Sequence, residues 1–136
     1  MQIHSKLVDV FALVSTPSGL EKWWALKANG EPLPGEEYQL NFGEGYDWTA
    51  RVTRIELNSS FELEMRSADA DWVNTRVGFS VQESTQATQL EFYHSGWPQI
   101  NDHYKISAFC WAMYLRLLKR FAEHGEFVPY HERLEA

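Results

Sequence analysis

The chain has 136 residues, of which 44% are hydrophobic, 23% are charged and 15% are aromatic, and its formal net charge is −7. This length fits one domain, and the balance of apolar and charged residues excludes a disordered or fibrous chain. The negative charge and the scattered Lys and Arg residues argue against nucleic acid as a partner, which would require clustered cations.

Two short helices are predicted near the start of the chain, after a stub of strand in "QIH". Apolar residues at helical spacing predict the first helix over about 6–14. Thr16 followed by Pro17 is typical of a second helix start, because the hydroxyl caps the helix and proline fits its first position. The glycines and prolines from residue 30 onward predict a loop after this helix.

Five strands are predicted between residues 38 and 94, because the hydrophobic period there changes from the helical one to two. Each segment has one apolar and one polar face, and the segments read "YQLNF", "WTARV", "FELEM", "TRVGFSV" and "TQLEFYH". Their connectors are short and rich in turn residues, which favours antiparallel neighbours over crossover connections. These strands are therefore expected to form a meander.

One long helix is predicted over about 102–123, and Gly125 is expected to end it. One face carries Tyr104, Ala108, Trp111, Leu115, Leu118 and Ala122, and the apolar band is widened by Ile106, Phe109, Met113, Leu117 and Phe121. The order of elements predicts an α+β fold in which a curved antiparallel sheet of about six strands wraps the C-terminal helix. We expect one domain over residues 1–125, a tail over 126–136, and a cavity near the two short helices.

Three segments resemble the START-like helix-grip superfamily, also called SRPBCC or Bet v 1-like. They are "VFALVSTPSGLEKWW", "FYHSGWP" and "WAMYLRLLKRFAEHG", and the resemblance covers residues 3–125. Within the superfamily, the chain is similar to the branch named after the activator of the ninety-kilodalton heat-shock protein's ATPase. The resemblance implies the helix-grip fold, whereas a stand-alone domain is not expected to inherit chaperone activation. The first strand is shorter than this family usually shows.

The adjacent Trp23 and Trp24 cannot both point into a core from one helical face, since neighbouring helix positions lie about 100° apart. The resemblance implies that this segment lies over the opening between the sheet and the long helix. One indole would then pack into the core while Trp24 faces the cavity. The alternative is that both rings only fill space at a helix end.

Aromatic residues on inward strand positions and on the final helix predict a pocket for an apolar molecule. With Trp24, the candidate ligand-binding residues are Tyr38, Phe42, Trp48, Phe79, Phe92, His94, Trp97 and Trp111. The alternative is that these rings fill the interior and leave no cavity.

His94 shares the inward parity of Leu90 and Phe92, which makes it a weak candidate for an acid–base group. A histidine that is hydrogen-bonded where its strand ends is the favoured alternative. "DADWVN" begins like a calcium loop but lacks the required Gly and the final Glu, and the His residues lack zinc spacing. Neither a metal nor a cofactor is predicted, and Cys110 is interpreted as a buried, inert thiol.

The sequence thus predicts a domain that binds a small hydrophobic or aromatic molecule between sheet and helix, with no defined catalysis. One alternative is an interaction module, resembling a chaperone activator or forming a homodimer through the apolar "FVPY" segment. The other is an enzyme of the cyclase or aromatase kind. No apolar run approaches the roughly 20 residues that cross a bilayer, and we expect a soluble, cytoplasmic protein.

Overall fold

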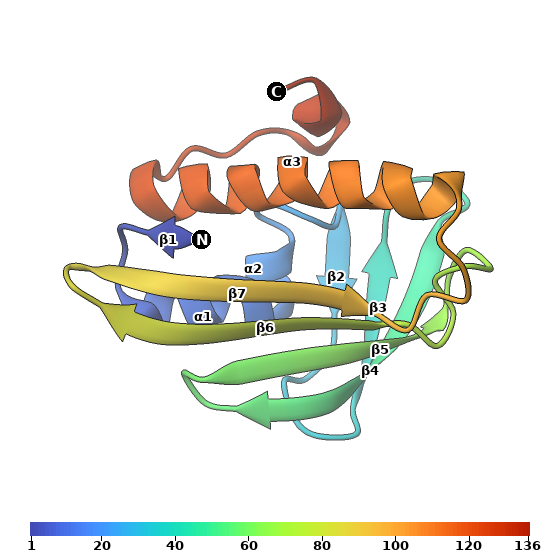
Figure 1. Ribbon diagram of the computed structural model, residues 1–136, viewed down its shortest axis with the longest axis horizontal. Helices are drawn as coiled ribbons and strands as arrows, with labels where there is room; N and C mark the ends of the chain where they lie inside the picture. The colour runs from blue at the N-terminus through green and yellow to red at the C-terminus, as the bar shows by residue number, and fades with distance from the viewer.

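Seven antiparallel strands form one open sheet in the computed structural model, which describes residues 1–136 (Figure 1). Their order across the sheet is β1-β7-β6-β5-β4-β3-β2, so β1 and β2 are the edges. The strands are β1 (Gln2–Ile3), β2 (Lys27–Asn29), β3 (Glu37–Asn41), β4 (Asp47–Glu56), β5 (Ser60–Ser67), β6 (Arg76–Ser84) and β7 (Ala87–Ser95). The helices are α1 (Leu7–Ser15), α2 (Pro17–Leu20), α3 (Asp102–His124) and the 3-10 helix η1 (Tyr130–Glu135).

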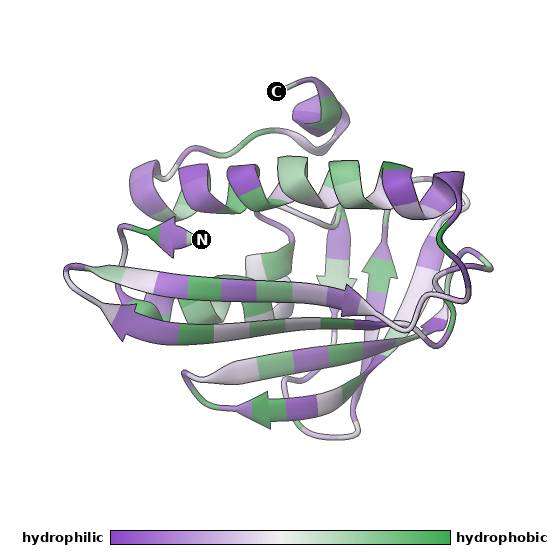
Figure 2. Cartoon of the chain, in the orientation of Figure 1, coloured by the Kyte–Doolittle hydropathy of each residue, from purple (hydrophilic) through white to green (hydrophobic).

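The five-strand meander is confirmed, together with its inward face. Most of the apolar positions predicted to point inward on these strands are buried, with Leu40, Leu63 and Val77 almost completely inaccessible. Phe42, Trp48 and Phe92 are partly buried. Polar and apolar positions alternate along these strands (Figure 2). The period of two therefore identified the face of the sheet that packs against the helices.

The sheet has seven strands, and the prediction of about six is corrected by β2. This edge strand has only three residues, and its central Ala28 pairs with Leu40 of β3. A strand this short, with a single apolar residue, carries no readable alternation. The stub at β1 is confirmed, since Gln2 and Ile3 pair with β7.

The two short helices pack against each other at close range. The predicted start of α2 is confirmed, because the Thr16 hydroxyl accepts a hydrogen bond from the Gly19 N–H at 3.0 Å and Pro17 occupies the first position. A Cβ atom on Gly19 would lie 2.2 Å from the Ala12 carbonyl oxygen and 2.6 Å from Leu13 Cα. Gly19 is thus required for the contact between α1 and α2.

The long helix α3 begins and ends as predicted. The Asn101 side chain accepts a hydrogen bond from the Tyr104 N–H, and Gly125 adopts the left-handed conformation at the C-terminal end with φ 66°. The buried band is narrower than predicted, because Ile106 and Phe109 are 61% and 67% exposed. These two side chains are therefore exposed at the edges of the apolar band of α3.

The C-terminal segment folds back over α3 and ends in η1 (Figure 1). Its Arg133 is 1% exposed and has backbone acceptors only. The guanidinium donates hydrogen bonds to the carbonyl oxygens of Val128 at 2.9 Å, Ala25 at 3.3 Å and Glu21 at 2.8 Å. These bonds attach η1 to the segment that carries the tryptophan pair.

Candidate functional site

Five aromatic side chains form a closed circuit between the sheet and α3. Around the circuit, the ring centroids are separated by 5.1 Å (Trp24 to Phe42), 5.0 Å (Phe42 to Trp48), 5.2 Å (Trp48 to Trp72), 5.9 Å (Trp72 to Trp111) and 5.1 Å (Trp111 to Trp24). These rings come from four places in the chain: the turn after α2, the β3–β4 hairpin, the loop between β5 and β6, and α3. The fold therefore assembles the circuit from residues that are far apart in sequence.

All five rings of the circuit line a pocket of about 510 Å³, which we call the aromatic pocket. Eleven of its fourteen lining residues are hydrophobic. The other lining residues are Tyr46, Asp69, His103, Ile106, Ser107, Cys110, Tyr114, Tyr130 and Leu134. Its volume and composition are those of sites that hold small organic molecules.

The polar groups of the aromatic pocket gather near the start of α3. His103 Nδ1 lies 3.0 Å from Asp71 Oδ2, and His103 Nε2 lies 4.0 Å from Asp69 Oδ2. Hydrogen bonds from His103 and Asn101 hold the pKa of the Asp71 carboxyl below its usual range. A ligand in the pocket would meet acidic groups at this end and aromatic rings elsewhere.

The C-terminal segment covers part of the aromatic pocket. Tyr130 and Leu134 belong to the lining, and the Tyr130 hydroxyl donates a hydrogen bond to the Phe42 carbonyl oxygen at 2.8 Å. The backbone acceptors of Arg133 hold this segment in place.

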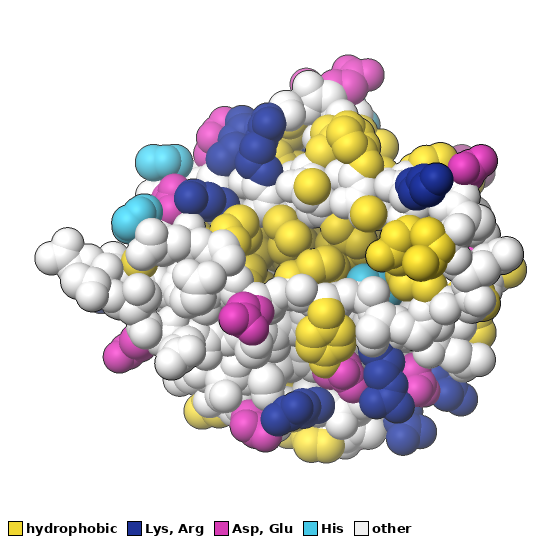
Figure 3. Space-filling view, in the orientation of Figure 1, with side chains coloured by type: hydrophobic (Ala, Val, Ile, Leu, Met, Phe, Trp, Pro, Cys, Tyr) yellow, Lys and Arg dark blue, Asp and Glu magenta, His cyan; other side chains and the backbone are white.

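A second hollow of about 450 Å³ lies between α3 and β7, and we call it the β7 groove. It is lined by Phe92, Tyr93, His94, Trp97, Tyr104, Ala108, Trp111, Ala112 and Leu115. Figure 3 shows hydrophobic side chains gathered along this groove. Trp111 lines both hollows and lies between them.

His94 takes part in a directed chain of hydrogen bonds. The Trp111 indole donates to His94 Nδ1 at 3.1 Å, and His94 Nε2 lies 2.8 Å from Thr75 Oγ1. The Thr75 hydroxyl donates to the Trp72 carbonyl oxygen at 2.5 Å. Because indole only donates, His94 must be neutral, with its proton on Nε2. Both ring nitrogens are thus occupied, and proton transfer by His94 would require one of these bonds to break.

We expect the folded chain to lose roughly 1 to 2 kcal/mol of stability between pH 7 and pH 5 through His94. Burial, with a smaller contribution from His103, lowers the pKa of His94 from 6.5 to about 4. Below pH 6.5 the unfolded chain binds a proton there that the folded chain does not, so this contribution is complete above pH 6.5 and is lost as the pH falls toward 4. Urea unfolding at the two pH values measures the loss. His94→Gln should reduce it, and an unchanged loss in that variant would contradict the assignment.

The predicted site residues divide into three groups. Trp24, Phe42, Trp48 and Trp111 line the aromatic pocket, and Phe92, His94 and Trp97 join Trp111 at the β7 groove. Tyr38 and Phe79 line neither hollow, and both are buried in the core.

The core contacts of Tyr38 and Phe79 account for their positions. The Tyr38 hydroxyl donates to the Ser15 carbonyl oxygen at 2.6 Å, and burial raises the pKa of this hydroxyl. Phe79 packs edge-on against Trp23, whose indole donates to the Leu13 carbonyl oxygen. Trp23 therefore points into the core, whereas Trp24 is also buried, at 2% exposed, and borders the aromatic pocket.

Ten of the fourteen lining residues of the aromatic pocket were not among the predicted ones, and three of them show why. Trp72 lies in the loop between β5 and β6, where no strand parity indicates its direction, and its indole donates to the Ser107 hydroxyl at 3.1 Å. Tyr130 belongs to the C-terminal segment, whose path the sequence does not give. Cys110 is partly exposed on the pocket wall, which corrects its interpretation as a buried thiol.

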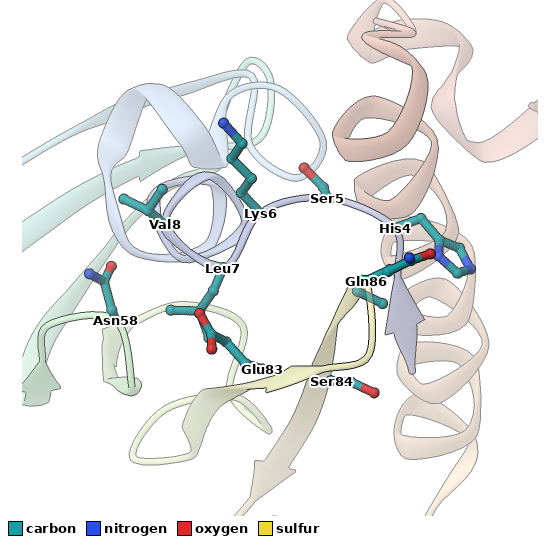
Figure 4. Close-up of a pocket in the computed structure, with 10 residues that line it drawn as sticks. His4, Ser5, Lys6, Leu7, Val8, Asn58, Glu83, Ser84 and Gln86 are labelled. Carbon is teal, nitrogen blue, oxygen red and sulfur yellow. The ribbon is translucent and has the colours of Figure 1, made fainter.

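A further hollow lies at the start of α1 and has different chemistry (Figure 4). It measures about 640 Å³, and only three of its ten lining residues are hydrophobic. Among the others are Ser5, Asn58 and Glu83. This lining offers fewer hydrophobic side chains to a small organic molecule than the aromatic pocket does.

No group of three or more His, Cys, Asp or Glu side chains is arranged to hold a metal ion. None of the helices combines the length and apolar character needed to cross a membrane.

An antiparallel sheet against one long C-terminal helix, with two short helices after the first strand, is the helix-grip arrangement of α+β proteins. Residues 5–123 match the family described as "Activator of Hsp90 ATPase homolog 1-like protein". The chain belongs to this family, within the START-like superfamily that the sequence motifs indicated. No curated protein sequence matches the chain.

Solved structures share the fold at low sequence identity. The Aha1 dimer from Colwellia psychrerythraea is 23% identical with a TM-score of 0.82, and the match covers 93% of this chain and 94% of that one. CalU16 from Micromonospora echinospora is 16% identical with a TM-score of 0.73, covering 93% and 64%. Protein SSP2350 from Staphylococcus saprophyticus is 18% identical with a TM-score of 0.75, covering 94% and 91%.

Proposed function

We propose that the chain binds a small hydrophobic or aromatic molecule in the aromatic pocket, gripped between the sheet and α3, with no chemical step on the ligand. The observation that carries this proposal is the cavity of about 510 Å³ whose lining is hydrophobic at eleven of fourteen residues. Rings such as Phe42, Trp48 and Tyr46 are partly exposed where they border this space, so a ligand that covers them would gain apolar contact.

Native mass spectrometry of protein purified from its own host, before and after organic extraction, tests this proposal. An adduct that disappears on extraction is expected, and its mass gives the size of the ligand. A protein mass without an adduct, together with no uptake of added 1-methylnaphthalene, would contradict the proposal.

Two variants on the same helix separate the aromatic pocket from the β7 groove. Cys110→Phe places a ring in the aromatic pocket, and Ala112→Phe places one in the β7 groove. We expect Cys110→Phe to weaken the binding of 1-methylnaphthalene at least about tenfold, because the new ring occupies the ligand's space. Ala112→Phe is the matched control and should leave the dissociation constant within about twofold. Calorimetric titration measures both, and the reverse pattern would move the site to the β7 groove.

An interaction module is the second candidate, favoured by the exposed Phe109 on α3 and by Ile106, which is exposed at the edge of the aromatic pocket. Exposed apolar side chains on a helix are a common feature of surfaces where proteins meet. A second copy of this chain is one partner to consider, since the Colwellia psychrerythraea protein is described as a dimer. The same native mass spectra distinguish the candidates, because a dimer mass without an adduct would favour association.

The cyclase or aromatase alternative has the least support, since both His94 nitrogens are engaged in hydrogen bonds. The division into a 1–125 domain and a 126–136 tail, and the cytoplasmic location, stay predictions.

A further inference from the structure

We propose that the preferred ligand of the aromatic pocket is a small organic cation, such as a quaternary ammonium or protonated amine that carries an apolar group. This inference rests on the proposed function, since it specifies which molecules the pocket accepts. It goes beyond a general preference for apolar molecules because it depends on the charge of the pocket and on the arrangement of its rings.

The rings of the circuit are close enough together for one cationic group to lie near several of them. Neighbouring centroids are 5.0 to 5.9 Å apart around a closed loop of five rings. A cation is attracted to a ring when it lies over the ring face within about 6 Å of the centroid, and rings at this spacing allow one cation to lie within that range of several of them. Four of the five rings are indoles, the side chain with the strongest attraction for cations.

The charges around the pocket favour a cation over an anion. No Lys or Arg is among the fourteen lining residues, whereas Asp69 is one of them. A second carboxylate, that of Asp71, lies 3.0 Å from His103 Nδ1, and its hydrogen bonds hold the pKa of the Asp71 carboxyl below its usual range. The net charge of −7 gives the whole protein a negative electrostatic potential, which also attracts cations.

The basic groups near the pocket are already engaged. Arg133 lies beside the Tyr130 ring, yet its guanidinium is directed to three backbone carbonyl oxygens and is not part of the lining. His103 is the one lining side chain that can carry a positive charge, and Asp71 and Asp69 both face it. The acceptors of Arg133 are neutral carbonyl oxygens, so its guanidinium keeps a positive charge, but this charge lies outside the lining. The charge that His103 can carry is offset by two carboxylates.

A pair of probes that differ only in charge tests the inference. Benzyltrimethylammonium and neopentylbenzene have the same shape, but a cationic nitrogen in the first replaces a neutral carbon in the second. Titration calorimetry at pH 8 in matched solvent gives the dissociation constant of each. We expect benzyltrimethylammonium to bind at least about tenfold more tightly.

Variants assign this preference to the pocket. Asp69→Asn removes the lining carboxylate, and Trp48→Leu removes one ring while keeping an apolar wall. Each should reduce the ratio of the two dissociation constants at least about threefold. Asp9→Asn is the matched control, because it changes the net charge equally from an exposed position on α1 outside this pocket, and it should leave the ratio unchanged.

The outcomes separate this inference from the proposed function. If both probes bind equally, or neopentylbenzene binds more tightly, the inference is overturned while binding in the pocket stands. If neither probe binds, both are overturned. An equal loss of the preference in Asp9→Asn and Asp69→Asn would overturn the role of the pocket lining.

Discussion

Trp111→Ala is expected to lower the free energy of unfolding by about 3 to 5 kcal/mol, which is a large part of the stability of a domain this size. Trp111 is 4% exposed and packs within 6.5 Å of Trp23, Trp24 and Phe92 by ring centroids. Its removal would join the two hollows and leave His94 Nδ1 without its indole donor. Urea denaturation followed by far-ultraviolet circular dichroism measures the change.

Two further variants make this result interpretable. Trp111→Phe keeps most of the packing and loses only the indole N–H, so we expect an intermediate loss of about 1 to 2 kcal/mol. Trp97→Ala removes another ring that contacts His94, but Trp97 is partly exposed outside the regular elements and should cost less than Trp111→Ala. An equal loss for Trp97→Ala and Trp111→Ala would contradict the central position of Trp111.

Gly19→Ala is expected to destabilise the fold by about 3 kcal/mol, although alanine favours helix formation more than glycine does. The added methyl would lie 2.2 Å from the Ala12 carbonyl oxygen and 2.6 Å from Leu13 Cα. Both are backbone atoms, so the clash can be relieved only if α1 and α2 move apart. The same denaturation experiment measures the loss.

Ser18→Ala is the control for the Gly19 substitution, since Ser18 is exposed on the same helix. We expect it to change stability by less than about 0.5 kcal/mol. If Gly19→Ala matched this control, the close contact of the two helices would not be required for stability.

Sequence periodicity predicted the architecture well, because burial imposes a period of two on β3 to β7. Periodicity predicted that four side chains on these strands point inward, and in the structure they line the two hollows: Phe42, Trp48, Phe92 and His94. The same parity also selected Phe79, which is buried in the core. Periodicity identifies the inner face of a strand, but it does not show where along that face the opposing layer leaves space.

The remaining differences have two other physical causes. Trp72 and Arg133 belong to irregular segments, whose course depends on tertiary contacts such as the hydrogen bonds from Arg133 to Glu21 and Ala25. Ile106 and Phe109 were predicted to widen the buried band of α3, yet they are exposed. An apolar band on a helix can exceed the width that the adjoining sheet covers, so its edges are exposed to solvent.

The connected tryptophans also determine the fluorescence of the protein. Ring contacts link all six indoles, from Trp23 through Trp24 and Trp111 to Trp72, and from there to Trp48 and Trp97. Chromophores at such separations exchange excitation, so the emission of the chain arises from one coupled array rather than from independent residues. Any molecule that enters either hollow would therefore change the fluorescence of the whole array, and no attached dye is needed to follow it.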